Sequence, residues 1–361
     1  MLFSVTMDLR FKERGDQGGE FKTMHITYHT IDLKLKHPFR ISRSVSEFRK
    51  NVIVEIEGGI GEAAPSPYYG DNAETVIEYL EKVKDQIGDD PFQIETILSN
   101  LNNRMIGNYP AKAAIDMALY DLAGKQLNIP IYRLLGLDGK KPLATSFTIG
   151  IDTPEKMKEK TKEAKDFLVY KVKVGVENDI DMVKAVREVT DAKIRVDANA
   201  GWKDAEEALS KINQLKKYKI EFVEQPIDPN DKQGLERINR ESDIPIIIDE
   251  YLMTSKDIPG FVGLCDGINI KLAKCGGIRE ALRMIHVARA HGLKVMIGCM
   301  IESSVGIAAA AQIGSLADYL DLDSNLLISN DPYEGMTVKD GMIYLSDLPG
   351  LGVTPKAAEM E

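Results

Sequence analysis

The sequence has few cysteines and no long apolar run. Its three cysteines, Cys265, Cys275 and Cys299, are scattered and odd in number, so we expect no disulfide framework and a reducing, cytoplasmic location. None of them stands in the C-x2-C spacing of a zinc site. No segment reaches the roughly 20 consecutive apolar residues of a membrane-spanning helix. Residues 1–23 also lack the apolar stretch of a signal peptide, and we therefore expect no membrane partner.

Positive charge is scarce as well. The chain has 46 Lys and Arg against 56 Asp and Glu, a formal net charge of −10, and no run of five basic residues. This balance argues against a nucleic-acid partner. With 361 residues, 43% of them hydrophobic, the chain is long enough for one large domain and a smaller one.

The order of strand-like and helix-like patterns divides the chain into four parts. Residues 1–23 mix charge with glycine and are expected to form a poorly ordered extension, with Met24 as the natural start. Residues 24–138 show two or three strand patterns and then three helical ones, which predicts an α+β capping domain. Residues 139–330 alternate strand and helix, which predicts a catalytic barrel. Residues 331–361 are rich in turns and are expected to pack back on the capping domain.

Five short apolar segments of the predicted barrel each end near a charged residue. They are YKVKVG (170–175), IRVDAN (194–199), EFVEQP (221–226), IPIIIDE (244–250) and GINIKLAK (267–274). Each resembles a buried strand closed by a turn. Their charged residues follow one another at intervals of 24, 27, 25 and 22, the length of a strand–loop–helix–loop unit: Lys173, Asp197, Glu224, Asp249 and Lys271. Parallel strands that close into a barrel gather their C-terminal ends around one mouth, where active sites lie.

The three acidic strand ends predict a metal site. Asp197, Glu224 and Asp249 offer hard oxygen ligands on successive strands, which suit Mg2+, with Mn2+ as an alternative. A single acid at a strand end would as readily cap the next helix or pair with a lysine. Three in succession, each after an apolar run, favour the metal.

The lysines on either side of these acids predict two bases. Lys173 and Lys271 would face each other across the barrel mouth, and such a pair suits removal of a proton from one face of a carbon and its return to the other. The metal would carry the charge of the enediolate formed in between. Lys171 shares a strand face with Lys173, so we expect each to lower the pKa of the other.

The order of these motifs resembles the enolase superfamily in its muconate-lactonising-enzyme-like branch. The matching motifs are K-x-K at 171–173, D-x-N at 197–199, E-Q-P at 224–226, D-E at 249–250 and the lysine at 271. The resemblance extends from Met24 to the C-terminus and implies a modified TIM barrel of the (β/α)7β type, with an N-terminal α+β capping domain that the C-terminal tail completes. It also implies that the two lysines are the bases and the three acids the magnesium ligands. Mandelate-racemase-like members carry a histidine on strand seven, which KVMIGCM (294–300) lacks.

Strand eight narrows the resemblance to dipeptide epimerases of the L-Ala-D/L-Glu epimerase type. DLDS (321–324) is similar to the D-x-D motif by which those enzymes hold the ammonium group of a dipeptide, and Asp321 and Asp323 share one strand face. IGCMIES (297–303) is similar to the corresponding segment. The resemblance implies inversion of the α-carbon of the second residue of an L-Ala-L-Xaa dipeptide. The further substrate contacts that we expect are Thr145, Asn199, Cys299, Ile301 and Arg43.

The preference for the second residue stays open. Two segments are predicted to be loops, 37–50 and 59–72, and the resemblance implies that they close over the substrate. Arg40 or Arg43 pointing inward would favour an acidic second residue, and Glu47 pointing inward a basic one. An apolar second residue would suit a pocket made of Phe39, Ile41 and Ile301.

Other functions remain on the same scaffold. An o-succinylbenzoate synthase or an N-succinylamino-acid racemase would use the same metal and lysines, but its substrate has no ammonium group for Asp321 and Asp323. A muconate cycloisomerase and a catalytically inactive barrel that only binds ligands are further alternatives. The sequence leaves open whether the protein forms a homo-oligomer.

Overall fold

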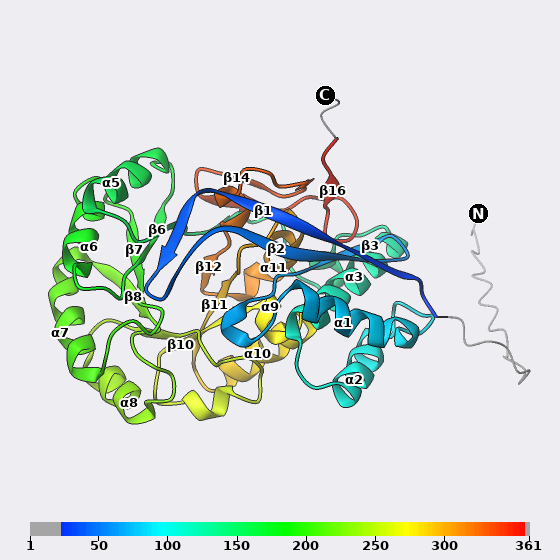
Figure 1. Cartoon of the computed structure of the whole chain (residues 1–361), viewed down its shortest axis with the longest axis horizontal. Helices are drawn as coiled ribbons and strands as arrows, with labels where there is room; N and C mark the ends of the chain where they lie inside the picture. The colour runs from blue at the N-terminus through cyan, green and yellow to red at the C-terminus, as the bar shows by residue number, and fades with distance from the viewer. Residues whose placement is uncertain (1–22, 358–361) are drawn as a thin grey trace, which may run out of the picture.

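The computed structural model describes residues 23–357, so nearly all of the expected extension at 1–23 lies outside the described residues. Its main element is an eight-stranded parallel sheet, and Figure 1 shows its helices on the outside. The strands, in sheet order from one edge, are β5 (Phe147–Ile149), β6 (Val169–Lys173), β7 (Lys193–Asp197), β8 (Ile220–Glu224), β9 (Ile246–Ile248), β10 (Gly267–Lys271), β11 (Lys294–Gly298) and β12 (Tyr319–Asp321). A parallel bridge between Thr145 and Leu320 joins the two edges and closes the barrel. The predicted fold class is confirmed.

The helices follow the strands as the barrel order requires. They are α5 (Pro154–Glu163), α6 (Asp179–Arg187), α7 (Ala205–Leu215), α8 (Lys232–Glu241), α9 (Leu272–Cys275), α10 (Ile278–Ala290), α11 (Ser304–Gln312) and α12 (Ser324–Leu327). Side chains cap several of them, as when Thr153 Oγ1 accepts a hydrogen bond from Lys156 N ahead of Pro154 in α5. The sequence pattern did not reveal α11. All nine of its residues are buried, so it shows no polar face and no helical periodicity.

The first part of the chain forms a cap on one side of the barrel. Its antiparallel sheet consists of β1 (Ile26–Ile41), β2 (Ser44–Ile56) and β3 (Gly59–Ala63), and its helices are α1 (Ala73–Val83), α2 (Ile94–Arg104) and α3 (Tyr109–Leu127). The strand β3 lies directly on α3, because a Cβ on Gly61 would come within 2.0 Å of the Ala114 carbonyl oxygen.

The prediction of loops at 37–50 and 59–72 is wrong in part. Segment 37–50 continues β1 and β2 to a tight turn at 42–43, and 59–72 begins with β3. The tip of this hairpin carries charged and exposed residues and has an irregular register after Lys34, so its sequence shows no alternation. Figure 1 shows the hairpin reaching from the cap across to the barrel.

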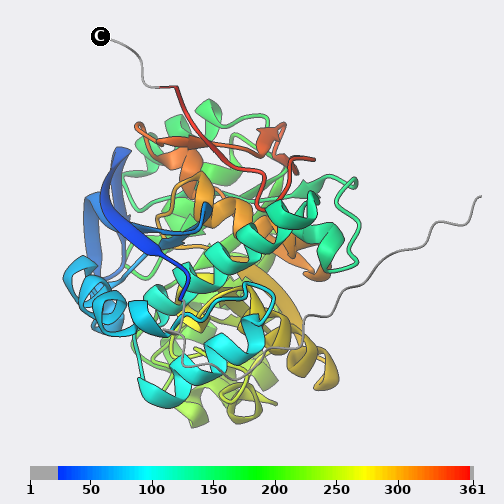
Figure 2. The ribbon, with the colours of Figure 1, turned by 90° about the vertical axis from the view of Figure 1, so that its right-hand side faces the viewer.

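The last part of the chain contacts both the barrel and the cap. It contains β13 (Tyr333–Glu334), β14 (Thr337–Lys339), β15 (Met342–Tyr344) and β16 (Thr354–Pro355), and β15 pairs with β4 (Leu143–Ala144). Leu351 N donates a hydrogen bond to Asp121 Oδ1 of α3 (2.7 Å), and Ile131 N of α4 (Ile131–Leu134) donates one to Gly350 O (3.0 Å). Figure 2 shows this red segment lying against the teal part of the chain.

The interior of the barrel is filled below its mouth. Phe222, Ile247 and Met296 form a small buried cluster with Tyr319 against it. The guanidinium group of Arg195 lies over the rings of Phe222 and Tyr319, at 5.2 and 5.0 Å from their centroids. A layer of closely packed side chains therefore lies directly below the charged residues of the mouth. Among the helices of residues 23–357, none combines the length and apolar character that crossing a membrane requires.

Candidate active site

The charged residues expected at the barrel mouth lie together in one layer. Lys173, at the end of β6, is in register with Asp197 of β7, which is in register with Glu224 of β8. Asp249 directly follows β9, and Lys271 ends β10. All five side chains are buried, none more than 8% exposed. Because neighbouring parallel strands end at the same level of the barrel, they bring together residues that are 22 to 27 positions apart in the sequence.

Each lysine of this layer is paired with carboxylates. Lys173 Nζ donates a hydrogen bond to Asp197 Oδ2 (2.6 Å), and Lys271 Nζ donates one to Asp249 Oδ2 (2.7 Å). Lys171 is more enclosed, and its Nζ lies 2.6 Å from Asp321 Oδ2, 2.8 Å from Glu224 Oε2 and 3.1 Å from Asp197 Oδ2.

These pairings change the expected pKa values. Burial opposes the charge on Lys171, but the attraction of Asp321, Glu224 and Asp197 is stronger, and the pKa of Lys171 is raised well above its usual value. The pKa of Lys271 is raised in the same way, against burial, by Asp249. The pKa of Lys171 is thus raised overall, because the three carboxylates around its ammonium group, which the sequence reasoning left out, outweigh any lowering by neighbouring lysines.

The acids of the layer fit a divalent cation. Burial, together with repulsion by the charges of Asp197 and Asp249, raises the pKa of Glu224 to about 7. Glu224 Oε2 receives no hydrogen bond of good geometry although Lys171 lies close, and Asn199 Oδ1 is also buried without a hydrogen bond. Within residues 23–357, no trio of acid, His or Cys side chains already forms a metal cage, since lysines lie against the carboxylates. The donor set nevertheless consists of the hard oxygens that Mg2+ prefers.

A cavity of about 480 Å3 opens above this layer, and we call it the reaction cavity. Most of the residues expected in the site line it, namely Arg43, Lys171, Lys173, Asn199, Asp249, Lys271, Cys299, Ile301, Asp321 and Asp323. Asp197 and Glu224 lie beneath this lining and are fully buried.

Asp321 and Asp323 form a second acidic group at one end of the cavity. Asp321 accepts hydrogen bonds from Lys171 Nζ and, at 2.6 Å, from Ser146 Oγ. Asp323 Oδ2 accepts a hydrogen bond from Thr148 N (2.6 Å). Burial and the charge of Asp321 raise the pKa of Asp323 to about 7. A cationic group bound here would relieve that repulsion.

Thr145, which we expected to contact the substrate, does not reach the reaction cavity. It precedes β5 rather than ending the strand, it is fully buried, and it is absent from the cavity lining. Its hydroxyl accepts a hydrogen bond from Leu322 N (2.8 Å) at the seam where the barrel closes. Thr148, which lies within β5, lines the cavity in its place.

The hairpin tip attaches to the barrel mouth through Arg43. One guanidinium nitrogen lies 2.9 Å from Glu250 Oε1, another donates a hydrogen bond to Asn199 O (2.8 Å), and the group stacks 4.1 Å from the ring centroid of Tyr68. Arg40 and Glu47, the other charged residues considered for substrate contact, do not line the reaction cavity, whereas Phe39, Ile41 and Ile301 do.

Sequence reasoning missed two cations of the site. Lys274 is buried and donates hydrogen bonds to the carboxylate and the carbonyl oxygen of Asp249; its only signal was a second lysine three residues after Lys271. Arg49 of β2 lines the reaction cavity, and no carboxylate within residues 23–357 pairs with it. Half-burial without a counter-charge lowers the pKa of Arg49. It shares a strand face with Asn51, whose Nδ2 donates to Ile301 O (2.8 Å), so it points toward the barrel.

Known proteins resemble the chain over almost its whole length. The mandelate racemase/muconate lactonizing enzyme N-terminal domain matches residues 25–136, and the enolase C-terminal domain-like family matches residues 155–359. An L-Ala-D/L-Glu epimerase of Bacteroides thetaiotaomicron is 44% identical over 93% of this chain and 88% of its own length.

Two solved structures share the fold closely. A dipeptide epimerase of Enterococcus faecalis, complexed with Mg and L-Leu-L-Tyr, has a TM-score of 0.87 and 35% identity over 92% of this chain and all of its own. An N-succinyl Arg/Lys racemase of Bacillus cereus has a TM-score of 0.88 and 32% identity over 93% of this chain and 96% of its own. The chain belongs to the enolase superfamily, with a mandelate racemase/muconate lactonizing enzyme N-terminal domain in front of its barrel.

Proposed function

We propose that the protein is a dipeptide epimerase that inverts the α-carbon of the second residue of a dipeptide. The observation that carries this proposal is the reaction cavity, which combines two lysines on opposite strands with a separate carboxylate pair. The relatives support it, since one is an L-Ala-D/L-Glu epimerase and another binds a dipeptide together with Mg.

Lys173 and Lys271 are the two bases of the proposal. They end β6 and β10, which are separated by three strands in either direction around the barrel, so they lie on opposite sides of the mouth. One lysine would take the α-proton from one face of the substrate, and the other would deliver a proton to the opposite face. Both are almost fully buried, which keeps competing water away from the reacting carbon.

Asp197, Glu224 and Asp249 are the proposed holders of Mg2+, and Mn2+ suits the same oxygens. Bound there, the cation supplies the positive charge that makes removal of a proton next to a carboxylate feasible. Lys171, which contacts both Asp197 and Glu224, would keep these carboxylates in place. Lys274 would do the same for Asp249.

Asp321 and Asp323 are the proposed site for the ammonium group of the dipeptide. A charge-assisted hydrogen bond to either carboxylate would fix the first residue, and with it the position of the next α-carbon. The same two carboxylates favour a dipeptide over an N-succinyl amino acid, because the carboxylate of a succinyl tail would be repelled by Asp321 and Asp323.

The second residue would place its side chain against the hairpin. The wall there is apolar at Ile41 and Ile301, and Arg49 provides a guanidinium group without a counter-charge. An acidic side chain with methylene groups, as in glutamate, matches both features. Arg43 is less suited to this role because Glu250 already holds it.

Proton NMR in D2O with Mg2+ tests the function directly. The panel would contain L,L-dipeptides and N-succinyl amino acids, and the signal followed is the α-proton. Exchange confined to the second residue of dipeptides is the expected result. Exchange only in the N-succinyl compounds would assign the protein to the racemases, and none at all, with metal bound, would leave a binding protein.

A further inference from the structure

We infer that a second, apolar pocket binds the side chain of the first residue of the dipeptide and selects a large apolar one. This inference rests on the proposed function. The pocket has a volume of about 350 Å3, and we call it the side pocket. It lies between the hairpin, the start of the barrel and the C-terminal segment, and its apolar walls are Leu35, Phe147, Phe167, Leu326 and Val338.

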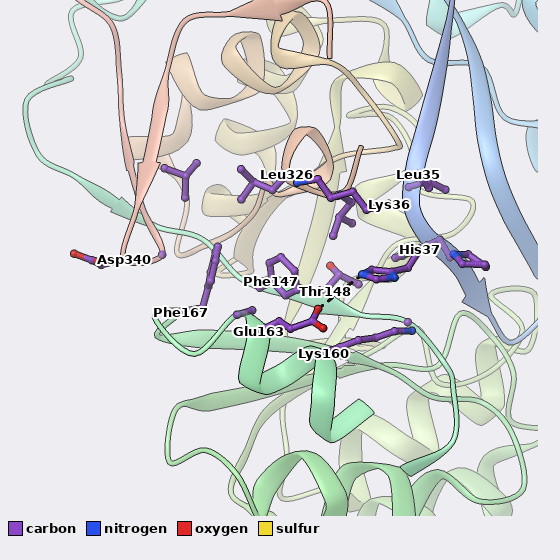
Figure 3. A pocket seen from close by; sticks show the side chains of 17 residues that line it. Leu35, Lys36, His37, Phe147, Thr148, Lys160, Glu163, Phe167, Leu326 and Asp340 are labelled. Atoms are coloured by element: carbon purple, nitrogen blue, oxygen red, sulfur yellow. Dashed lines mark ion pairs between the residues drawn. The ribbon is translucent and has the colours of Figure 1, made fainter. Parts of the chain in front are cut away.

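Figure 3 shows how separate segments build the side pocket. Phe147 of β5 and Phe167 after α5 lie on one side, with ring centroids 4.9 Å apart, and Leu326 of α12 lies opposite them. Val338 of β14 and Leu35 of β1 complete the apolar part. Five stretches of chain thus contribute one or two residues each to a single apolar surface.

The side pocket adjoins the reaction cavity at the end where the ammonium group would bind. Phe39, Thr148 and Leu327 line both spaces. Thr148 is also the residue whose backbone N–H contacts Asp323. A substrate ammonium held by Asp321 and Asp323 would therefore carry its own side chain toward the side pocket, and not toward the hairpin wall used by the second residue.

The titratable residues that line the side pocket are Lys36, His37, Lys160, Glu163 and Asp340. Lys160 Nζ lies 3.0 Å from Asp152 Oδ2. Figure 3 shows His37 reaching toward Glu163, with Nε2 and Oε2 3.8 Å apart and both side chains exposed to solvent. Lys36 and Asp340 have no ion pair among the described residues, but both are exposed to solvent. The less exposed part of the wall is mainly apolar and favours an apolar occupant.

The size of the side pocket argues for a large side chain. A volume of about 350 Å3 falls within the range of roughly 300–1,000 Å3 typical of ligand pockets, so the methyl group of alanine would leave most of it unfilled. A leucine or phenylalanine side chain would remove its own apolar surface and that of Phe147, Phe167 and Leu326 from water. The chain should accept L-Ala in the first position and prefer L-Leu or L-Phe.

The test measures kcat/KM for α-proton exchange in a dipeptide series that varies only in the first residue. The second residue is fixed as L-Glu, or as the fastest residue of the first panel, and the first is Gly, L-Ala, L-Val, L-Leu or L-Phe. We expect kcat/KM to rise with size and to be at least about tenfold higher for L-Leu than for L-Ala, since a single methylene group in a fitted pocket gives about tenfold or more.

Two substitutions in the side pocket, which does not include Lys173 or Lys271, test whether the preference for a large first residue arises there. Val338→Phe fills the side pocket. It should lower kcat/KM for the L-Leu substrate at least about tenfold and change kcat/KM for the L-Ala substrate less than about twofold. Leu326→Ala enlarges the pocket and should shift preference from L-Leu toward L-Phe. Val262→Phe adds the same atoms at an exposed site outside the pocket and should change neither ratio.

The outcomes separate the two proposals. If no dipeptide exchanges its α-proton, the proposed function is wrong. Two other results would reject the side pocket as the subsite and leave the proposed function standing. In the first, dipeptides exchange but kcat/KM does not depend on the size of the first residue. In the second, Val338→Phe lowers kcat/KM equally for the L-Ala and L-Leu substrates, and Leu326→Ala leaves the ratio of the two values unchanged. Exchange of N-succinyl compounds that Val338→Phe abolishes would assign the pocket to a succinyl tail instead.

Discussion

The barrel mouth and the cap hairpin meet at the same cavity but are built differently. At the mouth, the charged side chains are buried and hydrogen-bonded, as for Lys173 with Asp197. On the hairpin, most residues that line the cavity are half-buried, as is Ile41, or exposed, as is Val45, and Arg49 has no carboxylate partner in the described chain. Buried, mutually bonded groups can hold only one geometry, whereas half-buried side chains on a hairpin can be exchanged without disturbing the barrel.

This difference indicates a division of labour. Groups of the mouth should affect every substrate alike, because they act on the α-carbon and the carboxylate that all substrates share. Groups of the hairpin should change which side chain is accepted. The predictions that follow test this division, and a mouth residue that altered only selectivity would break it.

The largest effects should come from the lysines. Lys173→Ala and Lys271→Ala should each reduce epimerisation by a factor on the order of 1,000 for all substrates, because each removes one of two required proton carriers. Each variant should still exchange the α-proton of one configuration without inverting it, and the two should act on opposite configurations. NMR in D2O with L,L- and L,D-dipeptides measures both. A variant that inverts at the wild-type rate would remove that lysine from the mechanism.

Removal of divalent metal should abolish exchange and lower stability together. Without a cation, the repulsion among Asp197, Glu224 and Asp249 is relieved only in part by the lysines and by neutral hydrogen-bond donors, so Mg2+ should raise the melting temperature of the metal-free protein. Mn2+ should restore activity as well. Glu224→Gln should weaken both responses. A melting temperature unaffected by Mg2+ would contradict a metal site at these acids.

The ammonium site should give an intermediate effect. Asp323→Asn should lower kcat/KM for dipeptides by about 10- to 150-fold, the equivalent of roughly 1.5–3 kcal/mol for a hydrogen bond to a charged group. Asp321→Asn should lower it too, but that carboxylate also holds Lys171 and is less diagnostic. N-succinyl amino acids provide the comparison. If Asp323→Asn left dipeptide turnover intact, the ammonium assignment would fail.

The two arginines of the hairpin should give the smallest effects and differ in kind. Arg49→Met should reduce kcat/KM for an acidic second residue about tenfold relative to an apolar one, because it removes a guanidinium group without disturbing an ion pair. Arg43→Met should lower kcat/KM a few-fold for all substrates, because it loosens the contact with Glu250. It should not change the ratio of kcat/KM between acidic and apolar second residues. Steady-state kinetics on L-Glu and L-Leu dipeptides measure both ratios. A change of ratio in Arg43→Met alone would reverse the two roles.

Sequence reasoning worked best where one strand period decided the position. Each apolar run of the barrel has its charged residue at the C-terminal end, so the amino-acid pattern by itself was enough to place the five residues of the charged layer in one mouth. The same reasoning failed for Thr145, because the start and the end of the short strand β5 could not be distinguished in PLATSFTIG (142–150).

The remaining features depend on contacts between distant segments. Which arginine of residues 40–49 reaches the cavity follows from how the hairpin lies on the barrel, and no local pattern encodes that. The side pocket likewise combines residues from Leu35 to Gly341 and has no sequence signature. Lys274 could not be assigned because it lies in α9, after the end of β10, where the strand period no longer indicates which way a side chain points.

The attachment of the cap limits how a substrate can enter and a product can leave. Glu62 of β3 is fully enclosed and accepts hydrogen bonds from the backbone of Ser303 and Gly306 at the start of α11. Separating the cap body from the barrel would expose that carboxylate and break several buried bonds at once. The tip of the hairpin is held by fewer contacts: Ser42 and Arg43 bind Asn199 O and Glu250, and Arg40 O accepts a hydrogen bond from Ile151 N (2.9 Å). Bending of the tip would therefore break fewer buried contacts than movement of the whole cap, and it is the less costly way to open the cavity.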